Sequence, residues 1–207
     1  ALGNLIGGYA LAVAFAAPGG YTYLSTGLIL SAKDCAEIAG VMGHELAHVT
    51  QRHGAKAIER TLAAQTLIGM FLGDGLSAGA AALAFGVLQG TTFSQEQETE
   101  SDSVGLRITK SAGYNPYGLG DFFRKLLKKE KGIKAPQFLS SHPATKSRIR
   151  SVEKEIKRRY GKKLKRSHKR KCRTKMKLAA VKQHIRSGKM KTIAKLKASP
   201  KKTKKKR

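Results

Sequence analysis

The pair His44 and His48, four residues apart in one apolar stretch, constrains this chain more than any other feature of its sequence. Residues i and i+4 lie on the same face of an α-helix, so both imidazole rings can reach one metal ion. Glu45, next to the first histidine, is placed to act on a water molecule at that metal. The apolar spacing from about Cys35 to Arg60, preceded by Asp34 as a cap, predicts a single helix that carries the motif.

A second motif farther along the chain supplies the carboxylates that such a site needs. A catalytic zinc site has three protein ligands and an open position for water. Glu98 can be the third ligand, and Asp102, one helical turn later, can accept the N–H of a ligand histidine. The histidine motif also occurs on helices without a metal, but these same-face carboxylates favour the zinc site. Glu96 and Glu100 point elsewhere and are expected to be solvated, whereas His53 is expected to be structural.

The net charge of +28 is concentrated at the C-terminal end. Residues 157–207 hold 25 of the 41 Lys and Arg and none of the 13 Asp and Glu. Such a run does not fold compactly by itself, so we expect a disordered basic tail after a domain of residues 1–156. Anionic lipid at a membrane surface is the expected partner of this tail. Nucleic acid is a weaker candidate because no aromatic residue follows Tyr160, and an inert solvated tail also remains open.

Two further features of the sequence concern the tail and the start of the chain. Five apolar tail residues would line one face of a basic helix, namely Leu178, Val181, Ile185, Ile193 and Leu196. Because Cys35 begins the motif helix and Cys172 lies in the tail, we expect no structural disulfide between them. The chain opens on Ala1 rather than Met, so we expect a fragment or a processed form.

The remaining sequence predicts a mainly helical body. Residues 13–17 and 21–25 are expected to be extended segments around a glycine turn. Residues 61–90 are rich in Ala, Gly and Leu, and they predict either a pair of buried helices or a hairpin that covers the cleft or dips into a membrane. Gly43, just before the first ligand, fits close approach of a neighbouring strand. Further helices are predicted over about 93–111, 117–131 and 144–160.

Four motifs occur in the order in which they are found in a known family. They are His44-Glu45-Leu46-Ala47-His48, Glu98-x-x-x-Asp102, Ala17-Pro18-Gly19-Gly20-Tyr21 and His142-Pro143-Ala144-Thr145-x-x-Arg148-Ile149. Together they resemble the zinc metallopeptidase family that includes the CAAX prenyl endopeptidase, the heat-shock protease HtpX and the mitochondrial Oma-type protease. Within it, the soluble bacterial BepA-like branch is the most similar, over about residues 10–156. The resemblance implies a mainly α (α+β) gluzincin fold, with the active-site helix beside a small β-sheet.

The resemblance also implies roles for individual residues. It implies one Zn²⁺ per chain, bound by His44, His48 and Glu98, with Glu45 as the catalytic base. Asp102 would support a ligand from outside the metal's own coordination sphere.

Two regions are candidates for contact with a substrate. The segment 21–25 is the expected edge strand, with Gly19, Gly20, Tyr21, Thr22 and Tyr23 as substrate-binding residues, although a tight turn also explains the glycines. His142 and Arg148 are candidates for stabilising an oxyanion. His142 is alternatively a zinc ligand that blocks the open position, and both residues are also compatible with a purely structural role.

From these observations we expect a zinc-dependent metalloendopeptidase that hydrolyses peptide bonds in unfolded or misassembled envelope proteins. The resemblance implies a location in the bacterial periplasm or cell envelope, at the periphery of the membrane. The alternative is a non-catalytic, zinc-stabilised chaperone or scaffold that uses an occluded protease cleft.

Overall fold

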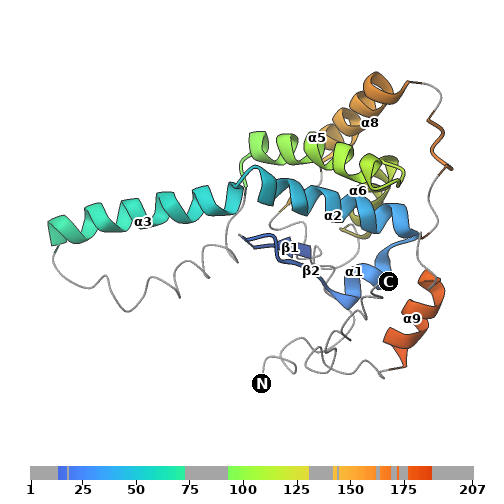
Figure 1. The fold of residues 1–207 in the computed structure, drawn as a ribbon, viewed down its shortest axis with the longest axis horizontal. Coiled ribbons are helices and arrows are strands. Elements are labelled where there is room, and N and C mark those ends of the chain that lie inside the picture. The colour runs from blue at the N-terminus through green and yellow to red at the C-terminus, as the bar shows by residue number, and fades with distance from the viewer. Residues whose placement is uncertain are drawn as a thin grey trace, which may run out of the picture.

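The computed structural model describes residues 14–17, 19–72, 93–130, 142–143, 145–161, 164–168, 172 and 177–187. Its strands are β1 (Ala14–Ala16) and β2 (Thr22–Leu24), and its helices are α1 (Thr26–Ser31), α2 (Cys35–Thr50), α3 (His53–Leu72), α5 (Gln95–Ser111), α6 (Tyr117–Glu130), α8 (Lys146–Tyr160) and α9 (Leu178–Arg186). The predicted class, mainly helical with one small sheet, is confirmed (Figure 1). No helix within these described ranges is both long enough and apolar enough to cross a bilayer.

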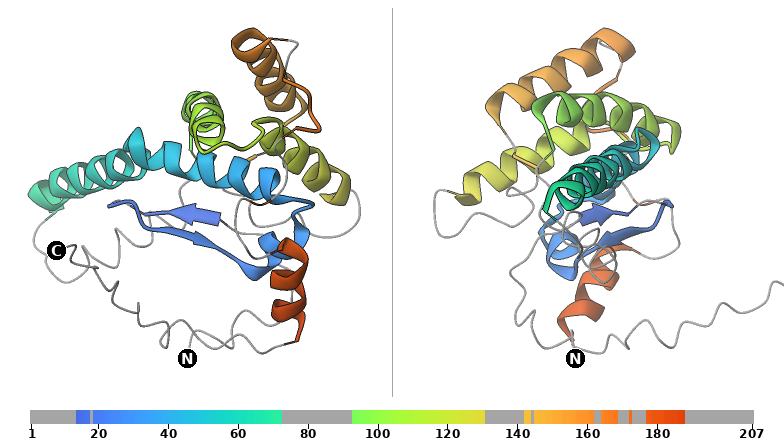
Figure 2. Two further views of the ribbon diagram at one scale, coloured as in Figure 1. Left: turned by 45° about the vertical axis from the view of Figure 1, so that its right-hand side comes forward. Right: turned by 90° about the vertical axis from the view of Figure 1, so that its left-hand side faces the viewer.

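Helix α2 is the centre of the arrangement. The sheet lies along one side of α2, whereas α5 and α6 lie on the other side, with α8 packed outside them (Figure 2). The core between these layers is built from buried apolar side chains, among them Ala14, Val41, Leu106, Phe122, Phe123 and Ile149. Each large apolar side chain contributes about 1.5–3 kcal/mol when it is fully buried. Apolar contacts on both sides therefore fix α2 in place.

The two strands form the predicted hairpin. They pair antiparallel, with Ala14 opposite Leu24 and Ala16 opposite Thr22. Gly19 and Gly20 both have φ of +92° in the connecting turn, a backbone conformation that a residue with a Cβ rarely adopts. The prediction of extended segments around a glycine turn is thus confirmed, while Pro18 and residue 13 lie outside the described residues.

The motif helix is shorter than predicted. The sequence predicts one helix over about 35–60, but α2 ends at Thr50 and a new helix, α3, begins at His53. Arg52 lies between them with φ of +59°, in the left-handed region, and this residue turns the chain. Apolar periodicity did not reveal the break because both helices have helix-compatible sequences. The predicted small-residue region continues α3 as far as Leu72, and residues 73–90 lie outside the described residues.

Helices α2 and α5 meet backbone to backbone. A Cβ added to Gly43 would lie 2.4 Å from Oγ1 of Thr109 and 2.7 Å from the carbonyl oxygen of Gly105. A Cβ added to Gly105 would lie 2.8 Å from the backbone nitrogen of His44. The prediction of a close neighbour at Gly43 is therefore confirmed, but the expected neighbour, a strand, is wrong. The neighbour is the helix that carries the carboxylates.

The first part of the predicted tail packs against the body. The side-chain amide of Asn115 donates hydrogen bonds of 2.7–3.1 Å to three carbonyl oxygens, those of Lys165, Arg166 and His168. The guanidinium of Arg166 forms ion pairs with Asp121 and Glu153. Helix α8 also continues to Tyr160, across the predicted domain boundary at 156/157, which stays a prediction.

Helix α9 belongs to the same docked segment. Its Ile185 is buried, and the ammonium of Lys182 donates to the carbonyl oxygens of Leu30 and Ala32 at the end of α1. The expectation of a disordered tail is therefore wrong for residues 164–168, 172 and 177–187. Charge composition misled it because the docking uses backbone carbonyls and acidic side chains of the body as partners. Residues 188–207, with Ile193 and Leu196, lie outside the described residues.

The expectation that the two cysteines stay unpaired is also wrong. Cys35, the first residue of α2, forms a disulfide with Cys172, and their Cα atoms are 5.1 Å apart. This separation lies within the usual range for disulfides. The bond links residues 137 positions apart, and closing a loop of this size contributes about 4–5 kcal/mol in the chain-entropy account. The expectation failed because it treated Cys172 as part of a free chain.

We predict that Gly105→Ala destabilises the protein by about 1–3 kcal/mol, because the new methyl group overlaps the backbone of α2. Gly120→Ala is the control, since its Cβ would meet only Val152 Cγ1, at 3.6 Å. This control should be neutral or stabilising by up to about 1 kcal/mol through helix propensity. Denaturant unfolding of both variants measures the difference. Equal free energies of unfolding would contradict the close helix contact.

Candidate active site

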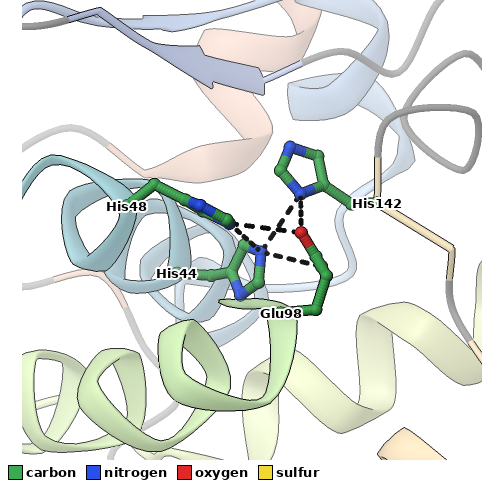
Figure 3. A group of neighbouring side chains, drawn as sticks. All are labelled: His44, His48, Glu98 and His142. Carbon is green, nitrogen blue, oxygen red and sulfur yellow. Dashed lines mark hydrogen bonds and ion pairs between the residues drawn. The ribbon is translucent and has the colours of Figure 1, made fainter. Parts of the chain in front are cut away.

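Four buried side chains from three parts of the chain converge on one point. Helix α2 contributes His44 and His48, helix α5 contributes Glu98, and the segment ahead of α8 contributes His142 (Figure 3). One candidate ligand atom from each residue lies within 4.8 Å of all the others. The structure therefore brings together the expected two histidines and glutamate, and it adds His142 as a fourth member.

The spacing of these atoms fits a single metal ion. Nε2 of His48 lies 3.1 Å from Nε2 of His44 and 3.3 Å from Oε1 of Glu98. Nδ1 of His142 lies 2.8 Å from the same carboxylate oxygen and 3.3 Å from Nε2 of His44. Tetrahedral ligands about 2.0–2.1 Å from zinc stand about 3.3 Å apart. These four distances, 2.8–3.3 Å, are close to that spacing.

The polar groups behind the two motif histidines lead to the same conclusion. Nδ1 of His44 lies 3.0 Å from Oδ1 of Asp102, and Nδ1 of His48 lies 3.0 Å from Nδ1 of His53. When both rings carry their proton on Nδ1, their Nε2 lone pairs face each other across 3.1 Å. Such an arrangement is stable only with a cation, a metal ion or a proton, between the two nitrogens.

Capping residues fix the elements that carry these side chains. The side chain of Asp34 accepts the N–H groups of Ala36 and Glu37 and so begins α2, as predicted. Ser94 and Gln97 form a reciprocal capping box at the start of α5, one residue before Glu98. Thr145 caps α8 by accepting the N–H of Arg148, 3.1 Å away. These caps therefore set the registers of the three helices that surround the site.

Charge determines the protonation of His44. Burial alone would lower its pKa, but the hydrogen bonds and charges of Asp102 and Glu98 outweigh burial and raise the pKa to about 9. Burial opposes ionisation of Asp102 as well, yet His44 and Arg148 hold the pKa of this carboxyl below its usual range. In the absence of a metal, His44 is therefore an imidazolium facing two carboxylates.

Two further members of the set, His48 and Glu98, keep a lone pair for a metal. Burial, assisted by the positive charge of His44, lowers the pKa of His48 to about 3, so its ring is neutral at physiological pH. Burial would raise the pKa of Glu98, but hydrogen bonds from His142, His44 and His48 hold that pKa below its usual range. A neutral imidazole and an ionised carboxylate are the forms that bind metal ions.

Glu45 lies beside this set without joining its hydrogen-bond network. Its carboxylate is buried, and Oε1 has no hydrogen-bond partner among the described residues. The same Oε1 lies 3.6 Å from Nε2 of His142. Burial raises the pKa of the Glu45 carboxyl above its ordinary value. A buried oxygen without a partner at the edge of a metal-ligand cluster suits a group that takes up a proton.

Arg148 occupies a different place from the one predicted for it. Its Nε and Nη2 donate to the two oxygens of Asp102, at 2.9 and 2.7 Å. Nη1 donates to the carbonyl oxygen of Pro143 at 2.9 Å and lies 2.6 Å from Oε2 of Glu98. The guanidinium also stacks 4.7 Å above the ring of Phe123. All three nitrogens are engaged inside the protein, so this placement does not support contact with a substrate oxyanion.

The predicted substrate-binding residues lie in the hairpin and outside the metal-ligand cluster. Gly19 and Gly20 form its turn, Thr22 begins β2, and Tyr21 and Tyr23 are 69% and 49% exposed. The ring of Tyr23 stacks on Phe15, with 4.6 Å between centroids. The hairpin is thus exposed, and it runs beside the helix that carries the motif histidines (Figure 2).

Sequence reasoning missed two contacts of the site. The ring of Phe93 lies 4.0 Å from that of His48 and 5.5 Å from that of His142, between centroids. Glu100, expected to be solvated, is half exposed, but its Oε2 lies 3.1 Å from Nε2 of His53. A histidine five residues after the motif was a signal for the second contact. No sequence pattern singled out Phe93, which lies just ahead of the Ser94 cap.

Comparison with known proteins agrees with this geometry. The sequence is 36% identical over 150 residues to the beta-barrel assembly-enhancing protease of Escherichia coli, covering 66% of this chain and 30% of that protein. It is 32% identical over 144 residues to the mitochondrial metalloendopeptidase OMA1 of Schizosaccharomyces pombe, covering 68% of this chain and 42% of that protein. The chain thus spans less than half the length of either relative. Residues 9–156 match the profile of peptidase family M48. The resemblance inferred from the four motifs is confirmed: the chain belongs to peptidase family M48.

Proposed function

We propose that this protein is a zinc endopeptidase that cleaves unfolded or misassembled polypeptides in the bacterial envelope. The observation that carries this proposal is the convergence of His44, His48, Glu98 and His142 within 4.8 Å, with the unpartnered oxygen of Glu45 beside them. Three imidazoles and one carboxylate at tetrahedral spacing favour zinc over metals that prefer six oxygen ligands. Relatives named for beta-barrel assembly support the choice of substrate class.

In the proposed mechanism His44, His48 and Glu98 would hold a zinc ion, which would supply Lewis acidity toward water and the peptide carbonyl. Glu45 accepts the proton of the attacking water and later donates it to the departing amine. Asp102 keeps the His44 proton on Nδ1, because the negatively charged Oδ1 lies 3.0 Å from that nitrogen. Arg148 neutralises Asp102 and positions Glu98, and in this proposal it replaces the predicted oxyanion role.

We assign His142 to the fourth ligand position in the closed site. Its Nδ1 lies 2.8 Å from Glu98 and 3.3 Å from His44, as a ligand would, and the side chain is 3% exposed. In this position the ring occupies the place that a water or a substrate carbonyl needs. His142 therefore limits cleavage until it moves away, in preference to the alternative role of stabilising an oxyanion.

We assign substrate alignment to the hairpin. An extended peptide can add to an exposed strand through backbone hydrogen bonds, with side chains in alternating positions. Thr22 and Tyr23 lie in β2, and Gly19, Gly20 and Tyr21 form the adjacent turn. The exposed rings of Tyr21 and Tyr23 offer apolar contact to the side chains of an unfolded polypeptide.

Location and membrane contact complete the proposal. The Cys35–Cys172 disulfide supports an oxidising compartment such as the periplasm. The docked basic segment supports peripheral contact with anionic lipid, to which each Lys or Arg near the surface contributes about 1 kcal/mol. Nucleic acid is the less favoured partner because no aromatic residue follows Tyr160.

We predict that Glu45→Gln abolishes cleavage of an unfolded protein such as casein while zinc binding and folding persist. The amide keeps the shape of the carboxylate but cannot accept the proton of water. Turnover, bound zinc and thermal unfolding are measured for the variant and the parent. Unchanged turnover would contradict the assignment. A parent that binds one zinc ion but cleaves no member of a peptide library would favour the non-catalytic scaffold.

We predict that Glu98→Gln and Asp102→Asn differ in their effects on zinc. Glu98→Gln leaves a poor third donor, so zinc affinity should collapse. Asp102→Asn should weaken affinity by about 10–100-fold, and it should also destabilise the zinc-free protein because Arg148 loses one of its two buried carboxylate partners. Chelator competition and thermal unfolding measure the two effects. Parent-like zinc affinity in Glu98→Gln would show that another group is the ligand.

We predict that His142→Ala raises basal cleavage, because it opens the fourth position. Initial rates on a fluorogenic unfolded substrate measure the effect, and His184→Ala, on the exposed face of α9, is the control. If His142 instead stabilises an oxyanion, kcat should fall by about 10²–10³-fold. A decrease of this size would overturn the ligand assignment.

A further inference from the structure

His53 connects a motif histidine to the surface through a chain of hydrogen bonds. Its Nδ1 lies 3.0 Å from Nδ1 of His48, and its Nε2 lies 3.1 Å from Oε2 of Glu100. The hydroxyl of Ser101 lies 3.3 Å from the same Nδ1. The imidazole of His53 is 2% exposed, whereas the side chain of Glu100 is 51% exposed. The chain therefore runs from the centre of the site to solvent.

The two facing Nδ1 atoms allow only one arrangement of protons when a metal is bound. A metal on Nε2 of His48 leaves the proton of that ring on Nδ1, which must then donate. His53 can accept it only if its own Nδ1 is bare, so its proton is on Nε2. That N–H donates in turn to the carboxylate of Glu100. The order of donors is therefore fixed from His48 to Glu100.

An imidazole behind His48 avoids the buried negative charge that a carboxylate would bring there. His44 is backed by Asp102, whose negative charge is neutralised by two hydrogen bonds from Arg148. No second buried guanidinium among the described residues contacts the His48 side of the site. A carboxylate directly behind His48 would therefore be a buried and uncompensated charge. The neutral ring of His53 instead links His48 to the half-exposed carboxylate of Glu100, whose negative charge is solvated by water.

The break between α2 and α3 makes this contact possible. In a continuous helix, residues five positions apart do not share a face. The left-handed Arg52, at φ of +59°, turns the chain so that His53 packs against His48, with ring centroids 5.0 Å apart.

We propose that His53 is a positioning residue for the metal site: through Nδ1 it fixes the ring orientation and the tautomer of His48, and Glu100 fixes the tautomer of His53. The proposal rests on the proposed zinc function, since it concerns how the chain holds a ligand of that metal. His53 itself touches neither metal nor substrate. It should therefore act on zinc affinity, and on activity only through zinc occupancy.

Two substitutions separate this role from simple packing. The Oδ1 of His53→Asn stands where Nδ1 stood and can accept from His48, whereas the amide of His53→Gln replaces only Nε2. We expect His53→Asn to bind zinc within about threefold of the parent and His53→Gln to bind about 10–100-fold more weakly. Zinc affinity is measured by competition with a chromophoric chelator, and thermal unfolding of the zinc-free variants reports packing. Equal affinities in the two variants would overturn the proposal.

The tautomers provide a second readout that packing alone does not move. In the zinc-loaded protein, ¹⁵N resonances of labelled histidine should show His53 protonated on Nε2 and bare on Nδ1. The opposite tautomer would overturn the proposal. Glu100→Ala should mix the two tautomers and weaken zinc binding several-fold, while Glu96→Ala, on the exposed face of the same helix, should change neither. A parent that binds no zinc would overturn the proposed function as well, whereas parent-like zinc binding in every variant would overturn only the role of His53.

Discussion

The backbone contact between α2 and α5 determines where the two carboxylates of α5, Glu98 and Asp102, can lie. Packed helices usually have axes 8–10 Å apart, with side chains filling the space between them. Gly43 and Gly105 lie against each other with only the hydroxyl of Thr109 beside them, and a Cβ on either glycine would overlap the opposite backbone. Asp102 therefore reaches Nδ1 of His44, and Glu98, one turn earlier on α5, reaches Nε2 of both motif histidines. One helix contact sets both the fold and the site.

The buried charges of the site form a nearly closed network. Glu98 and Asp102 both contact the guanidinium of Arg148 and the imidazole of His44. Hydrogen bonds from His142, His44 and His48 hold the pKa of Glu98 below its usual range, and His44 and Arg148 do the same for the pKa of Asp102. Buried charges persist only when they are paired in this way. Glu45 stands apart from the network, and burial correspondingly raises its pKa. One fold thus produces two kinds of carboxylate in adjacent positions, two with a lowered pKa and one with a raised pKa.

Sequence patterns predicted the parts of the site that depend on one helix at a time. The spacing of His44 with His48, and of Glu98 with Asp102, places each pair on one face, and the structure brings both faces together. The contacts of His53 depend on the turn of the chain at Arg52, which no apolar periodicity reveals. The docking of residues 164–168 and 177–187 depends on the acceptors that the body offers, such as the carbonyls at the end of α1. Composition describes the basic segment but not its partners. It therefore led to the expectations of a disordered tail and of unpaired cysteines.

Arg148 connects the two carboxylates of α5 to the segment that carries His142. Its Nη1 donates to the carbonyl oxygen of Pro143, next to His142, and lies 2.6 Å from Oε2 of Glu98. The Nη2 and Nε of the same guanidinium hold Asp102, which holds His44. Because the guanidinium is planar and rigid, these contacts share one geometry. The position of the His142 segment and the orientation of His44 are therefore coupled through a single side chain.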